Sequence, residues 1–322
     1  MNLWNRIKNF FKTKNTGKVN RVGIVAEYNP FHNGHIYQIN WIKENIQNPY
    51  IIVILTDKFT QRGEKHIASF KQRSKIAKKY GVNKVIKLSD KYSSQAAHIF
   101  AEFSVLELAK QKIDYLVFGS ETNNVELFKK IAKSIYQNLD QYNKLVKQFL
   151  KKGANSFPRA TNLALNELIG QDISMPNDIL GLEYVKTIYK HNLQIQPISI
   201  QRTIPFHSTD AKDQFASATK IRQMVKLNQD ISPFTPMTIE YSPKNDIAFT
   251  YEKFRKIVRK KSPQSLAKYN MISEGMENLF KKQVELNSNY DDFIKACTSR
   301  RYTSSRIKRA YLSILIGNKT KF

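Results

Sequence analysis

The stretch from residue 22 to residue 38 combines a short apolar run, a turn and two histidines, and it constrains the fold more than any other part of the sequence. The small and β-branched residues 22–26 suit a buried parallel strand, which Pro30 cannot extend. The pattern becomes helical after Gly34, whose missing side chain lets the backbone come close to a ligand. The stretch therefore predicts a strand, a turn and the start of a helix.

His32 and His35 lie on either side of Gly34, at the predicted helix N-terminus. Free backbone amides and the helix macrodipole favour a bound anion at such a position. Imidazole N–H groups add hydrogen-bond donors for phosphate oxygens. An isolated pair of histidines at this spacing is usually a plain surface feature. The strand before the pair and the helix after it favour a phosphate-binding turn.

Apolar runs recur along the first two thirds of the chain, separated by amphipathic segments such as Ile36–Ile46. The runs are Val22–Ala26, Tyr50–Leu55, Lys84–Leu88, Tyr115–Phe118 and Gln194–Ile200. This alternation predicts an α/β domain with a doubly wound, Rossmann-like parallel sheet. Ligands of such sheets bind beyond the carboxyl ends of the strands, so the residues after each run are the candidates for a site.

Several polar or small residues stand at or beside this predicted edge. Gly119 follows the fourth run and lets a backbone amide approach a nucleotide, although a plain turn also suits a glycine there. Arg202 follows the fifth run, where a buried guanidinium needs an anion partner. Asn177 lies at the start of a predicted helix, where it can also serve as a helix N-cap with no role in ligand binding. Lys71 and Arg73 lie on another predicted helix, either reaching phosphates or facing solvent.

A second anion-binding motif is predicted at residues 216–222, which read Ala-Ser-Ala-Thr-Lys-Ile-Arg. Ser217 and Thr219 place hydroxyl groups at a helix N-terminus, and Arg222 follows one turn later. Taken alone, the motif is an ordinary Ser/Thr helix cap. Together with His32 and His35, it predicts a phosphate clamp with two sides.

The chain has 322 residues and a formal net charge of +27. This excess of cations predicts a polyanionic partner, because neutralising phosphates releases counterions, although a genome biased towards lysine would produce the same excess. Cys297 is the only cysteine, which excludes an intrachain disulfide and a zinc cluster and is typical of a cytoplasmic protein. The longest apolar run, Tyr50–Leu55, is far shorter than the roughly 20 residues of a membrane span. The sequence predicts no membrane segment and indicates no protein partner.

The sequence predicts three parts: a basic extension at 1–20, a nucleotide-binding domain at 21–235 and a smaller, basic, all-helical domain at 236–322. The extension is interpreted as a frayed basic helix or as a weak RNA or membrane-surface contact. The proline-containing stretch 228–246 indicates a linker, after which no strand-like run follows. Residues 253–322 contain 17 lysines and arginines against 5 aspartates and glutamates.

A segment near the C-terminus combines arginines, hydroxyl groups and a tyrosine, which suits RNA binding. Arginines at a helix start suit phosphate contacts, and a tyrosine ring offers a platform on which a base can stack. A solvated basic helix is the alternative. The candidate RNA-binding residues are Arg300, Arg301, Tyr302, Arg306 and Arg309.

The string from Glu27 to His35, Glu-Tyr-Asn-Pro-Phe-His-Asn-Gly-His, resembles the His-x-Gly-His nucleotidyltransferase superfamily and, within it, the bacterial tRNA(Met) cytidine acetate ligases. Segments 118–121, 216–222 and 274–278 resemble the same family, so the likeness runs from about residue 21 to residue 317. It implies an enzyme that uses ATP to activate acetate as acetyl-adenylate. It also implies transfer of the acetyl group to the wobble cytidine of elongator tRNA(Met).

The resemblance also implies roles for individual residues. His32, His35 and Arg222 are expected to act on the triphosphate, Mg²⁺ is expected to neutralise the leaving pyrophosphate, and no protein metal ligand is predicted. Ser217 and Thr219 are expected at the far end of the triphosphate. The remaining ATP-binding residues are expected to be Val25, Glu27, Tyr28, Asn29, Pro30, Phe31, Asn33, Gly34, Gln38, Gly119, Asn177 and Arg202.

Two other classes of protein share part of this pattern. A small-molecule adenylyltransferase, joining a nucleotide to a phosphorylated acceptor, uses the same core motifs but gives the basic helical domain no role. A non-catalytic RNA-binding protein with a relic nucleotide site keeps the basic helices but loses the histidines or Arg222, all of which this chain retains.

Overall fold

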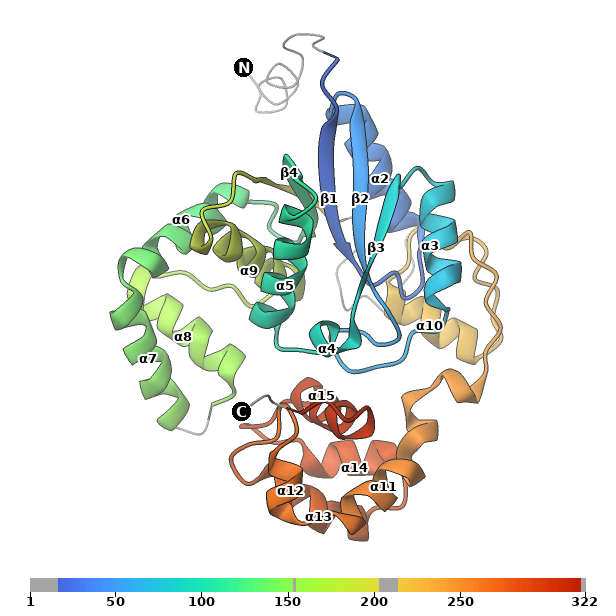
Figure 1. Cartoon of the computed structure of the whole chain (residues 1–322), viewed down its shortest axis with the longest axis vertical. Helices are drawn as coiled ribbons and strands as arrows, with labels where there is room; N and C mark the ends of the chain where they lie inside the picture. The colour runs from blue at the N-terminus through green and yellow to red at the C-terminus, as the bar shows by residue number, and fades with distance from the viewer. Residues whose placement is uncertain (1–16, 153–154, 203–213, 320–322) are drawn as a thin grey trace.

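The computed structural model describes residues 17–152, 155–202 and 214–319, and a five-stranded sheet lies at its centre (Figure 1). The strands are β1 (Asn20–Ala26), β2 (Pro49–Thr56), β3 (Lys84–Leu88), β4 (Tyr115–Ser120) and β5 (Gln196–Gln201). They lie in the order β3-β2-β1-β4-β5, and every neighbouring pair is parallel. The predicted parallel sheet is therefore confirmed. Residues 1–16, most of the predicted basic extension, lie outside the described residues.

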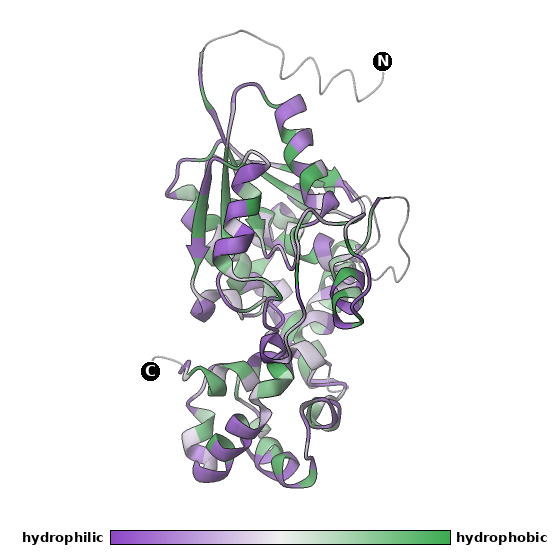
Figure 2. Ribbon diagram, turned by 90° about the vertical axis from the view of Figure 1, so that its right-hand side faces the viewer, coloured by the Kyte–Doolittle hydropathy of each residue, from purple (hydrophilic) through white to green (hydrophobic). Residues whose placement is uncertain are grey.

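Helices cover both faces of the sheet, and Figure 2 shows the apolar strands enclosed by helices with polar outer sides. One apolar core joins the sheet to α2 (Asn33–Asn45) and α3 (Phe70–Lys79). The core on the other face joins it to α5 (Ala97–Ala109), α6 (Val125–Gln137), α7 (Leu139–Lys151), α8 (Phe157–Ile169) and α9 (Pro176–Lys190). The short α4 (Asp90–Ser93) and α10 (Ala218–Lys226) lie near the carboxyl edge.

Strand β2 shows why the strands of this sheet appear in the sequence as continuous apolar runs. Ile51 and Val53 belong to the core on one face, whereas Ile52 and Ile54 belong to the core on the other. Successive side chains of a strand point to opposite faces, so a strand covered on both sides must be apolar at every position. The strand order reverses between β1 and β4, which places a crevice at their carboxyl ends.

The last part of the described chain is helical, as predicted. It contains the 3₁₀ turns η1 (Pro243–Asn245) and η2 (Ile247–Thr250), then α11 (Tyr251–Lys260), α12 (Pro263–Ala267), α13 (Met276–Leu286), α14 (Tyr290–Cys297) and α15 (Ser304–Leu315). Its core is rich in aromatic rings, including a stacked pair, Phe254 and Tyr311, with centroids 4.1 Å apart. Phe59, from the loop after β2, enters the same core, so the two parts are packed together.

The stretch between α10 and η1 returns to the sheet domain before it leaves for the helical part. Thr235 Oγ1 donates to the carbonyl of Phe31 over 2.6 Å, and Asn33 N donates to the carbonyl of Phe234 over 2.9 Å. Met237 is buried in the core of the sheet domain, whereas Ile247 is the first residue after it to join the helical core. The chain therefore passes from one core to the other between residues 237 and 247.

Arg73 is fully buried, and neither sequence-based interpretation of this residue is correct. Its Nε donates to the carbonyl of Ala68 over 3.0 Å, and its Nη1 donates to the carbonyls of Glu27 and Thr56 over 2.7 and 2.9 Å. Its Nη2 also donates to the carbonyl of Asp57. The guanidinium thus joins the carboxyl ends of β1 and β2, and it reaches neither solvent nor a phosphate. Lys71, two residues earlier on the same helix, is exposed.

No helix within residues 17–152, 155–202 and 214–319 is long and apolar enough to cross a bilayer.

His66 makes the folded state sensitive to pH. Its side chain is 7% exposed, and its Nε2 lies 2.8 Å from Thr56 Oγ1. Burial and repulsion from Arg73 lower the pKa of His66 well below its ordinary value of 6.5. Below pH 6.5 the unfolded chain therefore binds a proton that the folded chain does not. The stabilisation is complete above that pH and is lost as the pH falls.

We expect His66 to lower the free energy of unfolding by about 1.4 kcal/mol at pH 5.5 relative to pH 7.5. Urea unfolding of the wild type and of His66→Gln at both pH values measures this contribution. The variant should show a pH dependence smaller by about that amount. Equal pH dependence in the two proteins would contradict the assignment.

Candidate functional site

The two histidines of the predicted motif cap α2 together. His32 is the residue before the helix, and its Nδ1 accepts from Gly34 N over 3.0 Å. The Nδ1 of His35 accepts from His32 N over 3.1 Å, and the two ring centroids are 3.8 Å apart. Because both Nδ1 atoms accept backbone N–H groups, the proton of each neutral ring is on Nε2. The capping arrangement therefore leaves two Nε2–H donors for a ligand.

Both imidazoles are neutral at physiological pH. Burial, with repulsion from Arg202 and Arg222, lowers the pKa of His32 to about 3. Burial, with repulsion from His32 and Arg202, also lowers the pKa of His35 well below its ordinary value. Neutral rings can donate hydrogen bonds to phosphate oxygens without first taking up a proton.

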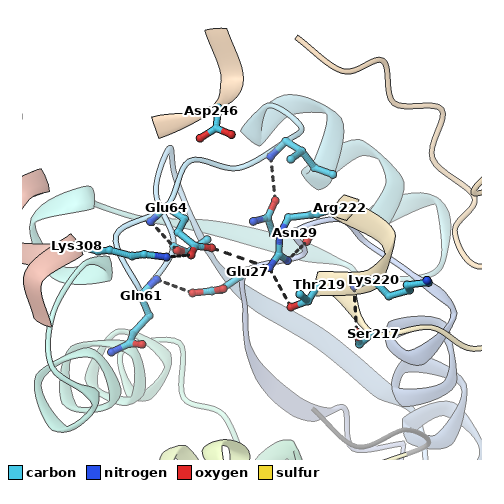
Figure 3. Close-up of polar contacts among 12 residues, drawn as sticks. Glu27, Asn29, Gln61, Glu64, Ser217, Thr219, Lys220, Arg222, Asp246 and Lys308 are labelled. Atoms are coloured by element: carbon cyan, nitrogen blue, oxygen red, sulfur yellow. Dashed lines mark hydrogen bonds and ion pairs between the residues drawn. The ribbon is translucent and has the colours of Figure 1, made fainter. Parts of the chain in front are cut away.

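The second predicted motif meets the first at the same place. Ser217 caps α10, its Oγ accepting from Lys220 N over 3.1 Å. Arg222 Nη1 donates to the carbonyl of Asn29 over 2.8 Å, and Arg222 Nη2 donates to Thr219 Oγ1 over 3.1 Å (Figure 3). One guanidinium thereby joins the turn before α2 to the N-terminus of α10, as a two-sided phosphate clamp requires.

Glu27 and Glu64 form an acidic layer behind Arg222 that the sequence analysis did not resolve. Glu27 Oε1 accepts from Gln61 N over 2.6 Å, and burial raises the pKa of Glu27. Glu64 pairs with Lys308 Nζ over 2.7 Å and lies 4.0 Å from Arg222 Nη2 (Figure 3). Burial opposes ionisation of Glu64, but the Lys308 and Arg222 charges hold its pKa below the ordinary value. The one sequence signal for Glu64 was its position after the second apolar run, where residues 61–64 are expected near the carboxyl edge of the sheet.

The opposite wall of the site is built at the ends of β4 and β5. The side chain of Arg202 lies over Gly119, where an added Cβ would be 3.4 Å from Arg202 Cγ. Asn177 is not the helix cap, because α9 begins at Pro176 and the residue before it is Met175. Instead, Glu121 accepts from Asn177 N over 3.1 Å and from Asn177 Nδ2 over 2.5 Å. A carboxylate at the end of β4 therefore satisfies the first turn of α9.

These groups surround one cavity of about 1080 Å³, slightly larger than the usual small-molecule site. It lies at the carboxyl edge of the sheet and extends to the helical domain. Of the residues predicted to bind nucleotide or phosphate, those on its wall are Val25, Glu27, Tyr28, Asn29, His32, Gly34, His35, Gln38, Gly119, Asn177, Arg202, Ser217, Thr219 and Arg222.

Three predicted nucleotide-binding residues do not lie on the cavity wall. Phe31 is fully buried in the apolar core, and the adjacent Pro30 is also buried. The side chain of Asn33 donates to the carbonyls of Gln214 and Pro233 over 2.7 and 2.9 Å. These residues shape the turn and hold the segment before η1, so the structure does not support their direct contact with a nucleotide.

The predicted RNA-binding residues fall into two groups. Arg301, Arg306 and Arg309 line the cavity, whereas Arg300 and Tyr302 do not. Arg300 is exposed, and its Nη2 lies 3.5 Å from Oδ1 of Asn155, in the segment between α7 and α8.

Tyr302 is 8% exposed and donates its hydroxyl to the carbonyl of Glu274 over 2.6 Å. The Arg306 guanidinium lies 5.0 Å from its ring centroid. The predicted stacking of a base on Tyr302 is therefore wrong for this arrangement, because the ring already packs in the helical core.

The parallel sheet, the His-x-Gly-His turn after its first strand and the second helix N-terminus facing that turn define a nucleotidyltransferase. The family model that matches residues 19–322 is that of the HIGH nucleotidyl transferases. The chain is 52% identical to a tRNA(Met) cytidine acetate ligase of Mycoplasmopsis synoviae (strain 53), over 93% of this chain and 97% of that protein. It is 49% identical to the ligase of the same name from Mycoplasma mobile, over 92% and 99% of the two chains. The chain thus belongs to the tRNA(Met) cytidine acetate ligase family.

A solved structure agrees with this assignment. The apo crystal structure of Thermotoga maritima TmcAL superposes with a TM-score of 0.83 at 28% identity, covering 94% of this chain and 76% of that one. TmcAL bound with alpha-thio ATP superposes with a TM-score of 0.82 at the same identity and coverage. This chain therefore shares its fold with a protein that has been solved with a bound ATP analogue.

Proposed function

We propose that this protein is an ATP-dependent ligase that acetylates the wobble cytidine of elongator tRNA(Met). An acetate oxygen attacks the α-phosphorus of ATP, the bond from that phosphorus to the β-phosphate oxygen breaks, and pyrophosphate leaves. The exocyclic amine of the cytidine then attacks the acetyl carbon, releasing AMP and one proton and forming 4-acetylcytidine. The observation that carries the proposal is the phosphate clamp, which opens into a cavity shared with the basic helical domain.

The proposed roles follow from the contacts in the clamp. The Nε2–H groups of His32 and His35 donate to triphosphate oxygens, because their Nδ1 atoms are already bonded to the backbone. Arg222, fixed by Asn29 and Thr219, supplies positive charge to the departing pyrophosphate. Donors that are held in place before the reaction stabilise developing charge at little reorganisation cost. No covalent intermediate with the protein is required.

Mg²⁺ is an expected companion of ATP in this reaction. In the described ranges, no group of three or more His, Cys, Asp or Glu side chains is placed to hold a metal ion. No catalytic step is assigned to the ion. Since tRNA, ATP and acetate are the proposed substrates, we propose the cytoplasm as the location.

Pyrophosphate release from ATP, with and without acetate, tests the first half of the reaction. Mass spectrometry of tRNA(Met) nucleosides then tests the second half. A ligase releases pyrophosphate only with acetate and adds an acetyl group to cytidine only with tRNA. Release that needs a phosphorylated small molecule, and not acetate, would identify an adenylyltransferase. Binding of tRNA without any ATP turnover would identify an RNA-binding protein with a relic site.

The exposed arginines of the basic segment give a separate prediction about tRNA. Arg300 and Arg301 are both exposed, and Arg301 also lies on the cavity wall. In the variant carrying Arg300→Ala and Arg301→Ala, we expect weaker tRNA binding, with a salt slope flatter by about one unit per lost phosphate contact. Acetate-dependent pyrophosphate release should not change.

Filter binding at several salt concentrations measures the slope. The matched control is Lys133→Ala, which removes an exposed cation on α6. If the double variant keeps the affinity and slope of the wild type, the two arginines belong to a solvated face.

A further inference from the structure

Arg309 is held where the helical domain meets the sheet domain. It lies on α15, follows Lys308 and is 9% exposed. The turn at Gly63 packs directly on this part of the helix, because a Cβ added there would lie 2.8 Å from the carbonyl oxygen of Lys308 and 3.0 Å from Arg309 N. The φ of Gly63 is +80°, which also favours glycine. Arg309 is thus fixed at the domain junction and lines the cavity.

Arg309 differs from the other arginines near this edge in having no partner. The Arg73 guanidinium donates to four carbonyls, and Arg222 donates to Asn29 and Thr219. By contrast, Arg309 Nε is buried without a hydrogen-bond acceptor, and no carboxylate among the described residues pairs with its side chain. A buried cation without a partner is costly unless an anion binds beside it.

The immediate surroundings of Arg309 are also positive. Burial, with repulsion from Arg306 and Arg62, lowers its pKa to about 10, so the guanidinium stays charged at neutral pH. The nearby carboxylates are already shared with other cations. Glu274 lies 3.2 Å from Arg301 Nε and 3.4 Å from Arg306 Nη1, and Glu64 pairs with Lys308. The local charge balance therefore calls for an anion from outside the chain.

The position of Arg309 indicates which class of anion can bind to it. The α2 and α10 termini already provide donors for the triphosphate, through His32, His35 and Arg222. A backbone phosphate of tRNA meets exposed arginines first, whereas Arg309 is nine-tenths buried. The anion that remains is the small carboxylate substrate. Its two oxygens match the planar fork of a guanidinium.

A single side chain links this anion site to the phosphate clamp. Glu64 lies within ion-pair distance of both Lys308 Nζ and Arg222 Nη2 (Figure 3). Lys308 is the neighbour of Arg309 on α15, and Arg222 belongs to the clamp. A carboxylate on Arg309 therefore enters the same cavity in which the triphosphate is expected.

We propose that Arg309, assisted by the adjacent Arg62, binds the carboxylate of acetate and presents it to the α-phosphorus of ATP. This inference rests on the proposed function and adds the residue that holds the second small substrate. It also gives Arg309, a candidate RNA-binding residue in the sequence, a role in acetate activation. The helical domain then contributes to acetate activation before any tRNA has bound.

The test is acetate-dependent exchange of labelled pyrophosphate into ATP, measured without tRNA in the full-length protein. In Arg309→Met we expect the KM for acetate to rise about 30-fold or more, because a charged hydrogen-bond partner is lost. The KM for ATP should stay within about twofold of wild type. Arg309→Lys should recover part of the acetate affinity, since it keeps the charge but not the fork. Lys282→Met, which removes an exposed cation of the same domain, is the matched control.

Arg62→Gln tests the same site from the sheet domain, and it keeps the proposal testable if Arg309→Met does not fold. It should also raise the KM for acetate more than the KM for ATP. An unchanged KM for acetate in folded Arg309→Met, with or without weaker tRNA binding, would overturn the inference. If wild-type exchange needs no carboxylate at all, the proposed ligase function itself is wrong, which is a distinct result.

Discussion

His35→Ala is expected to lower acetate-dependent pyrophosphate release about a hundredfold or more, equivalent to roughly 2.7 kcal/mol of transition-state stabilisation. The variant loses the Nε2–H donor that faces the cavity. It also loses the Nδ1 acceptor that holds His32 N over 3.1 Å. The loss should fall mainly on kcat if the donor acts most strongly on the developing charge.

His35→Asn separates these two losses. A carboxamide oxygen can accept from His32 N in place of Nδ1, but the side chain has no group at the position of Nε2. We expect it to regain about 1 kcal/mol of the stability lost with the cap, yet to remain as slow as His35→Ala. His191→Ala is the control, because it removes an imidazole that contacts Glu102 and does not line the cavity. Near-normal acetyl-adenylate formation by His35→Ala would remove the histidine pair from the mechanism.

Arg73→Met is expected to lower the free energy of unfolding by about 3–5 kcal/mol. The methionine fills much of the volume but donates no hydrogen bond. The carbonyls of Glu27 and Thr56 then lose their donor at the carboxyl ends of β1 and β2. Those strand ends lead into the histidine turn and the loop of residues 57–64, so we also expect weaker ATP binding.

Urea unfolding of Arg73→Met beside Lys71→Met measures the effect. Lys71 lies on the same helix but is exposed, so its replacement should change stability by no more than about 0.5 kcal/mol. Similar small effects for the two variants would show that the four carbonyls find other donors and that Arg73 is not a structural clamp.

The sequence predicted those features whose information is local. Continuous apolar runs specified strands buried on both faces, and the histidine and Ser/Thr motifs specified helix N-termini, because strand burial and helix capping depend on neighbouring residues. The edge of the sheet where the two motifs meet followed from parallel topology alone.

The contacts of the charged residues could not be predicted in this way. Lys308 and Glu64 are separated by 244 positions, and Arg73 binds the carbonyl of Glu27 from 46 positions away. No periodicity distinguishes a buried arginine such as Arg73 or Arg309 from one on a solvated face. The prediction that a base stacks on Tyr302 was wrong for the same reason. The burial of Tyr302 depends on its packing against the distant segment that carries Glu274.

The shared cavity has a consequence for the fate of the intermediate. Acetyl-adenylate is a mixed anhydride, which water can hydrolyse, wasting the ATP that formed it. Since residues of both domains line one cavity, the anhydride does not have to travel from a place of synthesis to a place of use. A cytidine that reaches the anhydride in this cavity would also displace water from the acyl carbon. The two-domain arrangement thereby protects a labile compound by confining it within one cavity.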